Sequence, residues 1–469
     1  MSDFDVIVLG SGFTGLRAAV AASAAGASVA VVEAQPELGG RSQYSFAHLM
    51  GAGTRFQKEA GVEDSPEALF KQYMRLHEYQ VDAANAHALT FGIGAEIEWL
   101  ADNGLVVKGI LPSETNEVMR IHRSGGGWKI IEVLLRVARE QGVEFILNTR
   151  VDRLLVEDGR IVGVEARGEQ LRSKAVVLAT GGFGGNKELV AEWLPTVAEL
   201  AGDWVLPVGG EELARFAQGD AIPLASAVGA QIAGKDLWEV TLRPGYVQVS
   251  LPSLPGHMVL VDANGRRFVD ECAGVAAMQG AVKHAQGPVH LIFDDAAKRA
   301  YTPSGDILAA GETKRRLHPD YVEDVVDAEV ERGSIVKAET IEELAAKIGI
   351  KPASLRGTLD QYNQDARAGF DSVQLKDPDQ MTPIEVGPFY ATEMRLASIG
   401  FTGAGPRVNA RAAVLDEHNL PIPGLFAGGE CASGIAGYGS AMDATPTATC
   451  LVFGRIAGES AAALASSLN

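Results

Sequence analysis

Six residues near the start of the chain, Gly10-Ser11-Gly12-Phe13-Thr14-Gly15, limit most strongly what it can fold into. They follow a short apolar run of strand character, residues 4–9, and precede an alanine-rich helical segment, residues 16–25. Gly10 allows a tight turn, Gly12 lets the backbone approach a pyrophosphate, and Gly15 lets helix and strand pack closely. The segment therefore predicts a β-α-β unit that binds a dinucleotide at the amino terminus of its helix.

A second predicted strand, residues 28–32, leads into Glu33, which stands 18 residues after Gly15. An acidic side chain at this position accepts hydrogen bonds from the ribose of a bound dinucleotide. A glycine pattern alone is often incidental, but here the strand, the helix and the acid are all present. The residues expected to bind the dinucleotide at this end are Gly10, Gly12, Phe13, Thr14, Gly15, Glu33 and Ala34.

Length and composition set bounds on the rest. At 469 residues the chain is too long for one ordinary core, so two or three domains are expected. Hydrophobic residues make up 46% and charged residues 22%, which is the balance of a globular protein. The formal net charge of -19 leaves no basic surplus to neutralise phosphates, which argues against nucleic acid or an anionic membrane as a partner.

The cysteines and the first residues give further expectations. Cys272, Cys431 and Cys450 form no CxxC pair and cannot supply four thiolates, so no metal site is predicted. The start lacks the basic region and apolar core of a signal peptide, and no uncharged apolar run reaches membrane-spanning length. We therefore expect a cytoplasmic protein with no membrane span.

The character of the chain changes twice along its length. Between residues 237 and 388 glycine becomes rarer and charge more frequent, with candidate helices at 340–348 and 352–367. The expected fold class is α/β: a discontinuous Rossmann-like domain, residues 1–236 and 389–469, with an inserted α+β capping or substrate domain, residues 237–388. Other expected helices lie within residues 65–102 and at 128–141 and 445–467, and other expected strands at 143–147, 150–156, 161–166 and 175–179.

Four further glycine-bearing motifs follow in order. They are Gly39-Gly40-Arg41-Ser42, Ala179-Thr180-Gly181-Gly182-Phe183, Pro423-Gly424-Leu425-Phe426-Ala427-Gly428-Gly429-Glu430 and Phe453-Gly454-Arg455-Ile456-Ala457-Gly458. In this order they resemble the large FAD-binding family that includes the fumarate reductase and succinate dehydrogenase flavoproteins and the ketosteroid dehydrogenases. One such motif could simply make turns in a sheet, but four in family order point to a common fold.

The resemblance implies FAD as the cofactor. Glu430 would contact its flavin-bearing part, Val151 would lie at the adenine side, and the final helix would direct its positive end at the isoalloxazine, easing hydride acceptance. Succinate dehydrogenases attach FAD to a histidine directly after an Arg-Ser pair; Gln43 stands there in this chain, so non-covalent FAD is expected. The FAD-binding residues that the resemblance adds are Gly40, Arg41, Ser42, Val151, Ala179, Thr180, Gly181, Gly182, Glu430, Thr445 and Thr447.

The substrate-binding residues match the family only in part. Fumarate reductases place an arginine proton donor after a Phe-x-Asn-Glu segment, whereas here Phe268-Val269-Asp270-Glu271 is followed by Cys272-Ala273-Gly274-Val275. The absence of that arginine argues against a dicarboxylate substrate. Residues 432–440 look more like the tyrosine- and glycine-bearing loop of the ketosteroid dehydrogenases, although the further catalytic tyrosine of those enzymes is missing.

Three residues are candidates for catalysis. The Tyr438 phenol could donate to a developing oxyanion, and the backbone of Gly439 could share that role. Arg123, in a segment that resembles one near the flavin, could bind a substrate carboxylate or equally pair with a surface acid.

Together these features lead to one hypothesis and two alternatives. The hypothesis is an FAD-dependent oxidoreductase that transfers hydride between flavin N5 and a CH–CH bond next to a carbonyl, either desaturating a cyclic ketone or oxo acid or reducing the enone. The alternatives are a fumarate-type reductase of an unsaturated acid and a non-catalytic FAD electron-carrier subunit. The expected partners are a small ketone, enone or oxo acid and an electron acceptor that the sequence does not identify.

Overall fold

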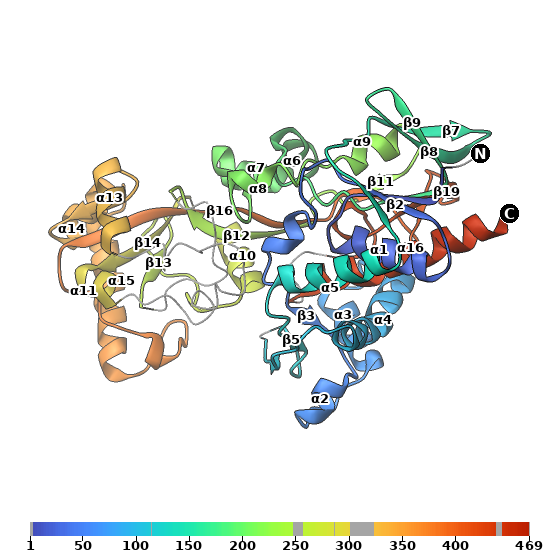
Figure 1. Ribbon diagram of the computed structural model, residues 1–469. Helices are drawn as coiled ribbons and strands as arrows, with labels where there is room; N and C mark the ends of the chain where they lie inside the picture. Colours follow the sequence, from blue (N-terminus) through green and yellow to red (C-terminus); the bar gives the residue numbers. More distant parts are fainter. Residues whose placement is uncertain are drawn as a thin grey trace.

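The computed structural model describes residues 3–113, 115–246, 257–285, 287–300, 323–437 and 443–468. These residues form two lobes, and the long strand β16 (Phe389–Thr402) runs from one toward the other (Figure 1). One lobe contains an eight-stranded sheet and both chain ends, and the other contains a six-stranded sheet. The predicted α/β class is confirmed.

The eight-stranded sheet is built around β1 (Phe4–Leu9). It pairs in parallel with β2 (Val29–Val32) on one side and β9 (Glu169–Leu178) on the other. The parallel array continues through β6 (Glu144–Ile146) and β19 (Pro421–Ala427). These strands are rich in valine, leucine and isoleucine because a parallel sheet is covered on both faces. The remaining strands of this sheet are β7 (Arg153–Glu157), β8 (Arg160–Ala166) and β18 (Ala413–Leu415).

The register of this sheet brings the predicted motifs together. Leu9, Val32, Leu178 and Ala427 end neighbouring parallel strands at one edge. Each strand leads directly into a predicted segment, beginning at Gly10, Glu33, Ala179 and Gly428 respectively. Ligands of open α/β sheets bind outside these carboxyl ends. Segments more than 400 residues apart in the chain therefore meet at one site.

Helices cover this sheet. α1 (Phe13–Ala24) packs against α16 (Thr445–Ser467) and α5 (Gly127–Glu140), and α4 (Ala83–Asp102) packs against α16 and α3 (Pro66–Leu76). The expected helices in 65–102, at 128–141 and at 445–467 are confirmed. The expected strand at 175–179 is part of β9, which begins earlier, at Glu169, because its first half pairs with β8.

The second lobe is organised by β16. This strand pairs with β12 (Trp238–Pro244), β14 (Val289–Asp294), β15 (Val336–Ala338) and β10 (Leu206–Pro207), and β13 (Val259–Val261) pairs with β14. Its core also includes buried side chains between residues 183 and 205 and between 390 and 404. The bounds 237 and 388 for the inserted domain therefore stay a prediction. Helices of this lobe include α10 (Val275–His284), α14 (Ile341–Lys347) and α15 (Pro352–Ala368).

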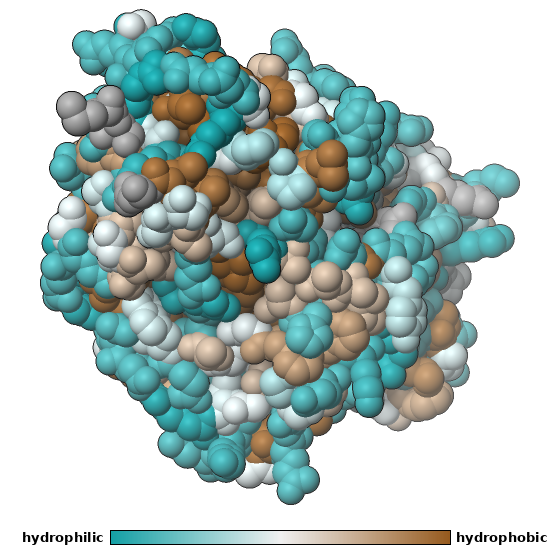
Figure 2. All heavy atoms as spheres, turned by 90° about the vertical axis from the view of Figure 1, so that its right-hand side faces the viewer, coloured by the Kyte–Doolittle hydropathy of each residue, from teal (hydrophilic) through white to brown (hydrophobic). Residues whose placement is uncertain are grey.

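One described helix, α16, is long and apolar enough to cross a membrane by length and composition. Of its most apolar window, 61% is buried inside the protein. Its partners are α1, α4 and strands of the eight-stranded sheet, so its apolar side chains serve as core. Figure 2 shows the face of the molecule at which α16 ends. Hydrophilic residues predominate on this face, and hydrophobic ones lie between them in small groups.

Glycines on α16 set its distance from α1. A Cβ atom at Gly458 would lie 2.1 Å from the backbone oxygen of Ala18, and one at Gly454 would lie 2.6 Å from that of Thr14. Each clash is with backbone of a packed helix, which has no rotamer to change. Alanine at either position would therefore push the two helices apart.

We expect Gly458→Ala to lower the free energy of unfolding by about 1–3 kcal/mol through overpacking. The matched control is Gly357→Ala on α15, where an added Cβ meets nothing within 4 Å. That change should raise stability by about 0.5–1 kcal/mol, because alanine favours a helix over glycine. Denaturant unfolding of both variants measures the difference. Equal effects in the two variants would contradict close packing of α1 on α16.

Candidate functional site

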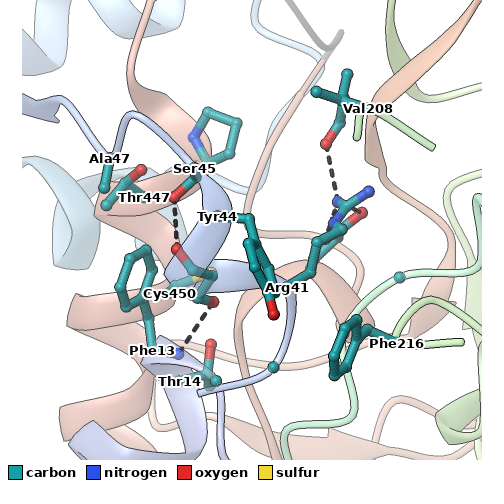
Figure 3. Close-up of a pocket in the computed structure, with 18 of the residues that line it drawn as sticks. Phe13, Thr14, Arg41, Tyr44, Ser45, Ala47, Val208, Phe216, Thr447 and Cys450 are labelled. Atoms are coloured by element: carbon teal, nitrogen blue, oxygen red, sulfur yellow. Dashed lines mark hydrogen bonds and ion pairs between the residues drawn. The ribbon is translucent and has the colours of Figure 1, made fainter. Parts of the chain in front are cut away.

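A single cavity of about 880 Å³ runs along the carboxyl edge of the eight-stranded sheet and continues to the second lobe. Its lining comes from the turn after β1, the segment after β2, the start of α16 and residues of β12, β16 and α10. Figure 3 shows part of this lining: Phe13 and Thr14 lie near Cys450, and the rings of Tyr44 and Phe216 project into the space. Those two ring centroids are 6.0 Å apart.

One end of the cavity contains the buried carboxylate of Glu33. Its oxygens accept hydrogen bonds from the Ser11 backbone N–H (2.9 Å), the Ser11 hydroxyl (2.6 Å) and the Gln35 backbone N–H (2.9 Å). These bonds fix the carboxylate beside the glycine turn. Glu33 therefore lies where an acid is needed to receive a ribose.

The glycines of the turn are required by close backbone approach. Gly10 has a φ of 100°, and a Cβ there would lie 2.4 Å from the Ala179 backbone oxygen. Gly15 lies outside the cavity lining but packs still closer, because its Cβ would stand 1.8 Å from the Gly10 oxygen. Gly15 was predicted both to allow this close packing and to bind the dinucleotide. The structure confirms the packing, whereas the position of Gly15 outside the lining does not support the binding role.

The middle of the cavity is organised by an ion pair between Arg41 and Glu430. Arg41 Nη2 lies 2.9 and 2.8 Å from the two Glu430 oxygens and also donates to the Gly400 backbone oxygen at 2.9 Å. Thr402 donates to Glu430 Oε1 from its backbone N–H at 3.2 Å. A Cβ at Gly182 would lie 2.2 Å from Glu430 Oε1, so the glycine leaves room for this carboxylate.

Two of the helices that begin at the cavity, α1 and α16, are not capped by the side chain of their N-cap residue. The first N–H of α1, at Phe13, donates to Ser42 Oγ at 3.2 Å. α1 begins after Gly12 and α16 after Ala444. The first N–H groups of a helix carry partial positive charge and favour anions. With glycines that leave space beside them, the described residues fit a dinucleotide whose pyrophosphate lies at α1 and whose reactive ring lies near α16.

Most of the predicted cofactor residues line this cavity. Thr445 does not: it is buried, and its hydroxyl points to Met50 Sδ at 3.9 Å. Arg123 is also outside the lining, and its backbone pairs with Lys108 and Gly109. Tyr438 and Gly439 lie outside the described residues. The predicted residues in the lining are Gly10, Gly12, Phe13, Thr14, Glu33, Ala34, Gly40, Arg41, Ser42, Val151, Ala179, Thr180, Gly181, Gly182, Glu430 and Thr447.

Sequence reasoning missed the residues at the far end of the cavity. Glu239 on β12 and Asp443, just before α16, both line it, together with residues 272–277 before and within α10. Burial raises the pKa of Glu239, and the negative charges of Asp443 and Glu430 raise it further, to about 7. No motif marks Glu239, and the sequence analysis predicted no strand at its position.

Residues 268–271, which resemble a fumarate reductase segment, contain a side chain with a structural role, that of Glu271. This side chain is fully buried and forms ion pairs with Arg267 and Lys376, both at 2.9 Å. Arg267 also pairs with Asp371. The cluster anchors the chain just before Cys272, where the cavity lining begins.

This cavity has a glycine turn suited to phosphate at one end and the second lobe at the other. Such an arrangement places the chain in the class of proteins that bind a dinucleotide cofactor and expose part of it to a separate lobe. Sequence comparison then identifies the family. Residues 5–441 match the FAD binding domain family, and the chain belongs to it. The predicted family, the Rossmann-like fold with a capping domain, and FAD as the cofactor are confirmed.

Three similar proteins illustrate the family. The chain is 30% identical to a probable fumarate reductase, Ifc3, from Shewanella frigidimarina, over 97% of this chain and 74% of that protein. It is 29% identical to a urocanate reductase from Eggerthella lenta, over 99% and 75%. Among solved structures, a 3-ketosteroid-Δ4-(5α)-dehydrogenase from Rhodococcus jostii RHA1 superposes with a TM-score of 0.75 at 28% identity, covering 98% of both chains.

We expect Glu33→Ala to weaken FAD binding about 10- to 100-fold, because the ribose loses its acceptor and the Ser11 donors lose theirs, at about 1–3 kcal/mol. Fluorescence titration of flavin-free protein with FAD measures the change. Glu140→Ala, which removes an exposed carboxylate that pairs with Arg136 on α5, is the control and should bind FAD normally. Unchanged affinity in Glu33→Ala would contradict this placement of the ribose.

Proposed function

We propose that the protein is an FAD-dependent oxidoreductase of a CH–CH bond next to a carbonyl, acting on a small ketone, enone or oxo acid. FAD supplies hydride acceptance or donation at its flavin ring. Glu33 would hold the adenosine ribose, the start of α1 would hold the pyrophosphate, and the Arg41–Glu430 pair with the start of α16 would hold the flavin end. The second lobe closes the far end of the cavity and leaves space there for a substrate.

The choice of substrate rests on one observation: the arginines that line the cavity are already paired with acidic side chains of the protein. Among the described lining residues the only arginines are Arg41, Arg150 and Arg215, and no lysine is present. Each arginine has an acidic partner: Glu430, Asp220 and Glu37 respectively. The far end instead contributes Glu239 and Asp443.

A dicarboxylate would place like charges together at this end, which costs several kcal/mol. A ketone or enone has no such penalty, and a single carboxylate has less of it. This balance favours the proposed substrates over fumarate. The relatives named above are a probable fumarate reductase, a urocanate reductase and a dehydrogenase of a ketosteroid, so similar chains act on different substrates.

We also propose that FAD binds without a covalent link. Gln43, at the position of the family's attachment histidine, is buried, and its amide donates to the backbone oxygens of Leu38 and Gly40. An amide has no nucleophilic nitrogen to bond to the flavin. The cytoplasmic location stays a prediction.

A panel of compounds mixed with the purified flavoprotein without oxygen tests the proposed function. Oxidised protein should bleach with a cyclic ketone or saturated oxo acid, or reduced protein should regain its colour with the corresponding enone. Fumarate and succinate serve as comparison compounds and should react slowly. A response to fumarate alone would favour the fumarate-type alternative, and a response to none would favour an electron-carrier subunit.

Tyr438 remains our proposed donor to the substrate carbonyl. A phenol beside a developing oxyanion is worth about 10²–10³ in turnover. We therefore expect Tyr438→Phe to keep FAD, judged by its visible spectrum, while turnover on the responding compound falls by about that factor. Turnover within a few-fold of the unmodified protein would assign the role to another group.

A further inference from the structure

Glu239 occupies an irregular point of the second sheet that faces the cofactor cavity. On β12 it lies opposite Phe401 of β16, whereas the next residue, Val240, lies opposite Ile399. Gly400 is therefore an extra residue on β16, and the pairing forms a β-bulge. Bulges re-aim side chains and are frequent beside active sites.

Gly400 connects Glu239 to the cofactor end of the cavity. A Cβ at Gly400 would lie 3.0 Å from Glu239 Oε1, so any side chain there would crowd the carboxyl. The Gly400 backbone oxygen receives a hydrogen bond of 2.9 Å from Arg41, whose guanidinium also pairs with Glu430. The bulge thus places the Glu239 carboxyl close to residues that hold FAD and leaves it facing the cavity.

The neighbouring acids are fixed by partners. Asp443 accepts a hydrogen bond from the Ser113 hydroxyl, and its backbone N–H donates to Thr115 Oγ1 at 2.9 Å. Glu430 is held by Arg41 and Thr402. Within the described part of the chain no hydrogen bond to the Glu239 carboxyl is formed, so its proton is not committed to another protein group.

The surroundings of Glu239 favour the protonated form of its carboxyl. The charged groups that act on it are Asp443 at the start of α16, Glu430 after β19, and Arg41. Burial together with the two acids outweighs Arg41 and raises the pKa of Glu239 to about 7.

We propose that the Glu239 carboxyl exchanges a proton with the substrate carbon next to the carbonyl and is thus a catalytic acid and base. This inference rests on the function proposed above. In reduction, the carbon–carbon double bond gains a hydride equivalent from the reduced cofactor at the β-carbon and the Glu239 proton at the α-carbon, and the carboxylate then regains a proton from water. In desaturation, the same two C–H bonds break: the α-proton passes to the carboxylate, and the β-hydride with its electron pair passes to the oxidised cofactor.

The pH dependence has a definite sign in each direction. Reduction needs the protonated acid, so its rate should fall as pH rises through about 7. Desaturation needs the carboxylate, so its rate should rise over the same interval. Replacing Asp443 with asparagine removes a negative neighbour and should move this transition to lower pH, which a purely structural role of Glu239 would not produce.

The test compares the unmodified holoenzyme with Glu239→Gln, Glu239→Asp and Asp443→Asn. We expect Glu239→Gln to retain FAD, lower turnover by about 10²–10⁴ and lose the transition near pH 7. Glu239→Asp should recover part of the rate. Glu393→Gln, which alters a partly exposed acid of β16 paired with Arg395, is the control and should leave rate and pH profile unchanged.

A second measurement is independent of turnover. Infrared difference spectra between pH 5 and pH 9 should contain a protonated-carboxyl C=O band that titrates near pH 7 and is missing in Glu239→Gln. Without that band, or with turnover of Glu239→Gln within a few-fold of the unmodified enzyme, the assignment is wrong. If the band titrates but no compound of the panel reacts, the proposed function fails, and with it the catalytic role.

Discussion

The site depends on the contact between α1 and α16, the first and last long helices in the chain. Glycines at positions 454 and 458 let these helices approach until backbone meets backbone. Both helices begin at the cavity, so the positive ends of their dipoles lie beside a bound anion. If the helices moved apart, the pyrophosphate end and the flavin end of the cavity would no longer keep a fixed separation.

Local sequence was sufficient for the cofactor end. Gly10, Gly12 and Glu33 act through backbone geometry and short-range hydrogen bonds, which a motif of fixed spacing encodes. The parallel register then brings the later motifs to the same edge, so residues as distant as Thr180 and Glu430 were also found. The sequence could not distinguish a residue that lines the cavity from one that packs behind the lining. Gly15 and Thr445 are of the second kind.

The substrate end was less predictable because it forms through long-range pairing. From its resemblance to a segment near the flavin, Arg123 was expected either to bind a substrate carboxylate or to pair with a surface acid. Its backbone pairs with residues 108–109, and it lies outside the cavity lining. Glu239 reaches the cavity only because β16 carries an extra residue opposite β12. The bulge and the proximity of Asp443 to Glu239 cannot be predicted from a single sequence. The segments that contain Glu239, Gly400 and Asp443 are each separated by more than 30 residues along the chain.

The position of α16 also bears on how the protein is made. The nucleotide-binding sheet needs β1 and β2 from the beginning of the chain, but its neighbours β18 and β19 and its covering helix α16 come from the final sixty residues or so (Figure 1). On the ribosome, at about 5–20 residues per second, the apolar faces of β1 and α1 are synthesised tens of seconds before their last partners. The nascent chain must therefore keep these surfaces from associating elsewhere until α16 has been made, and the cofactor site is incomplete before then.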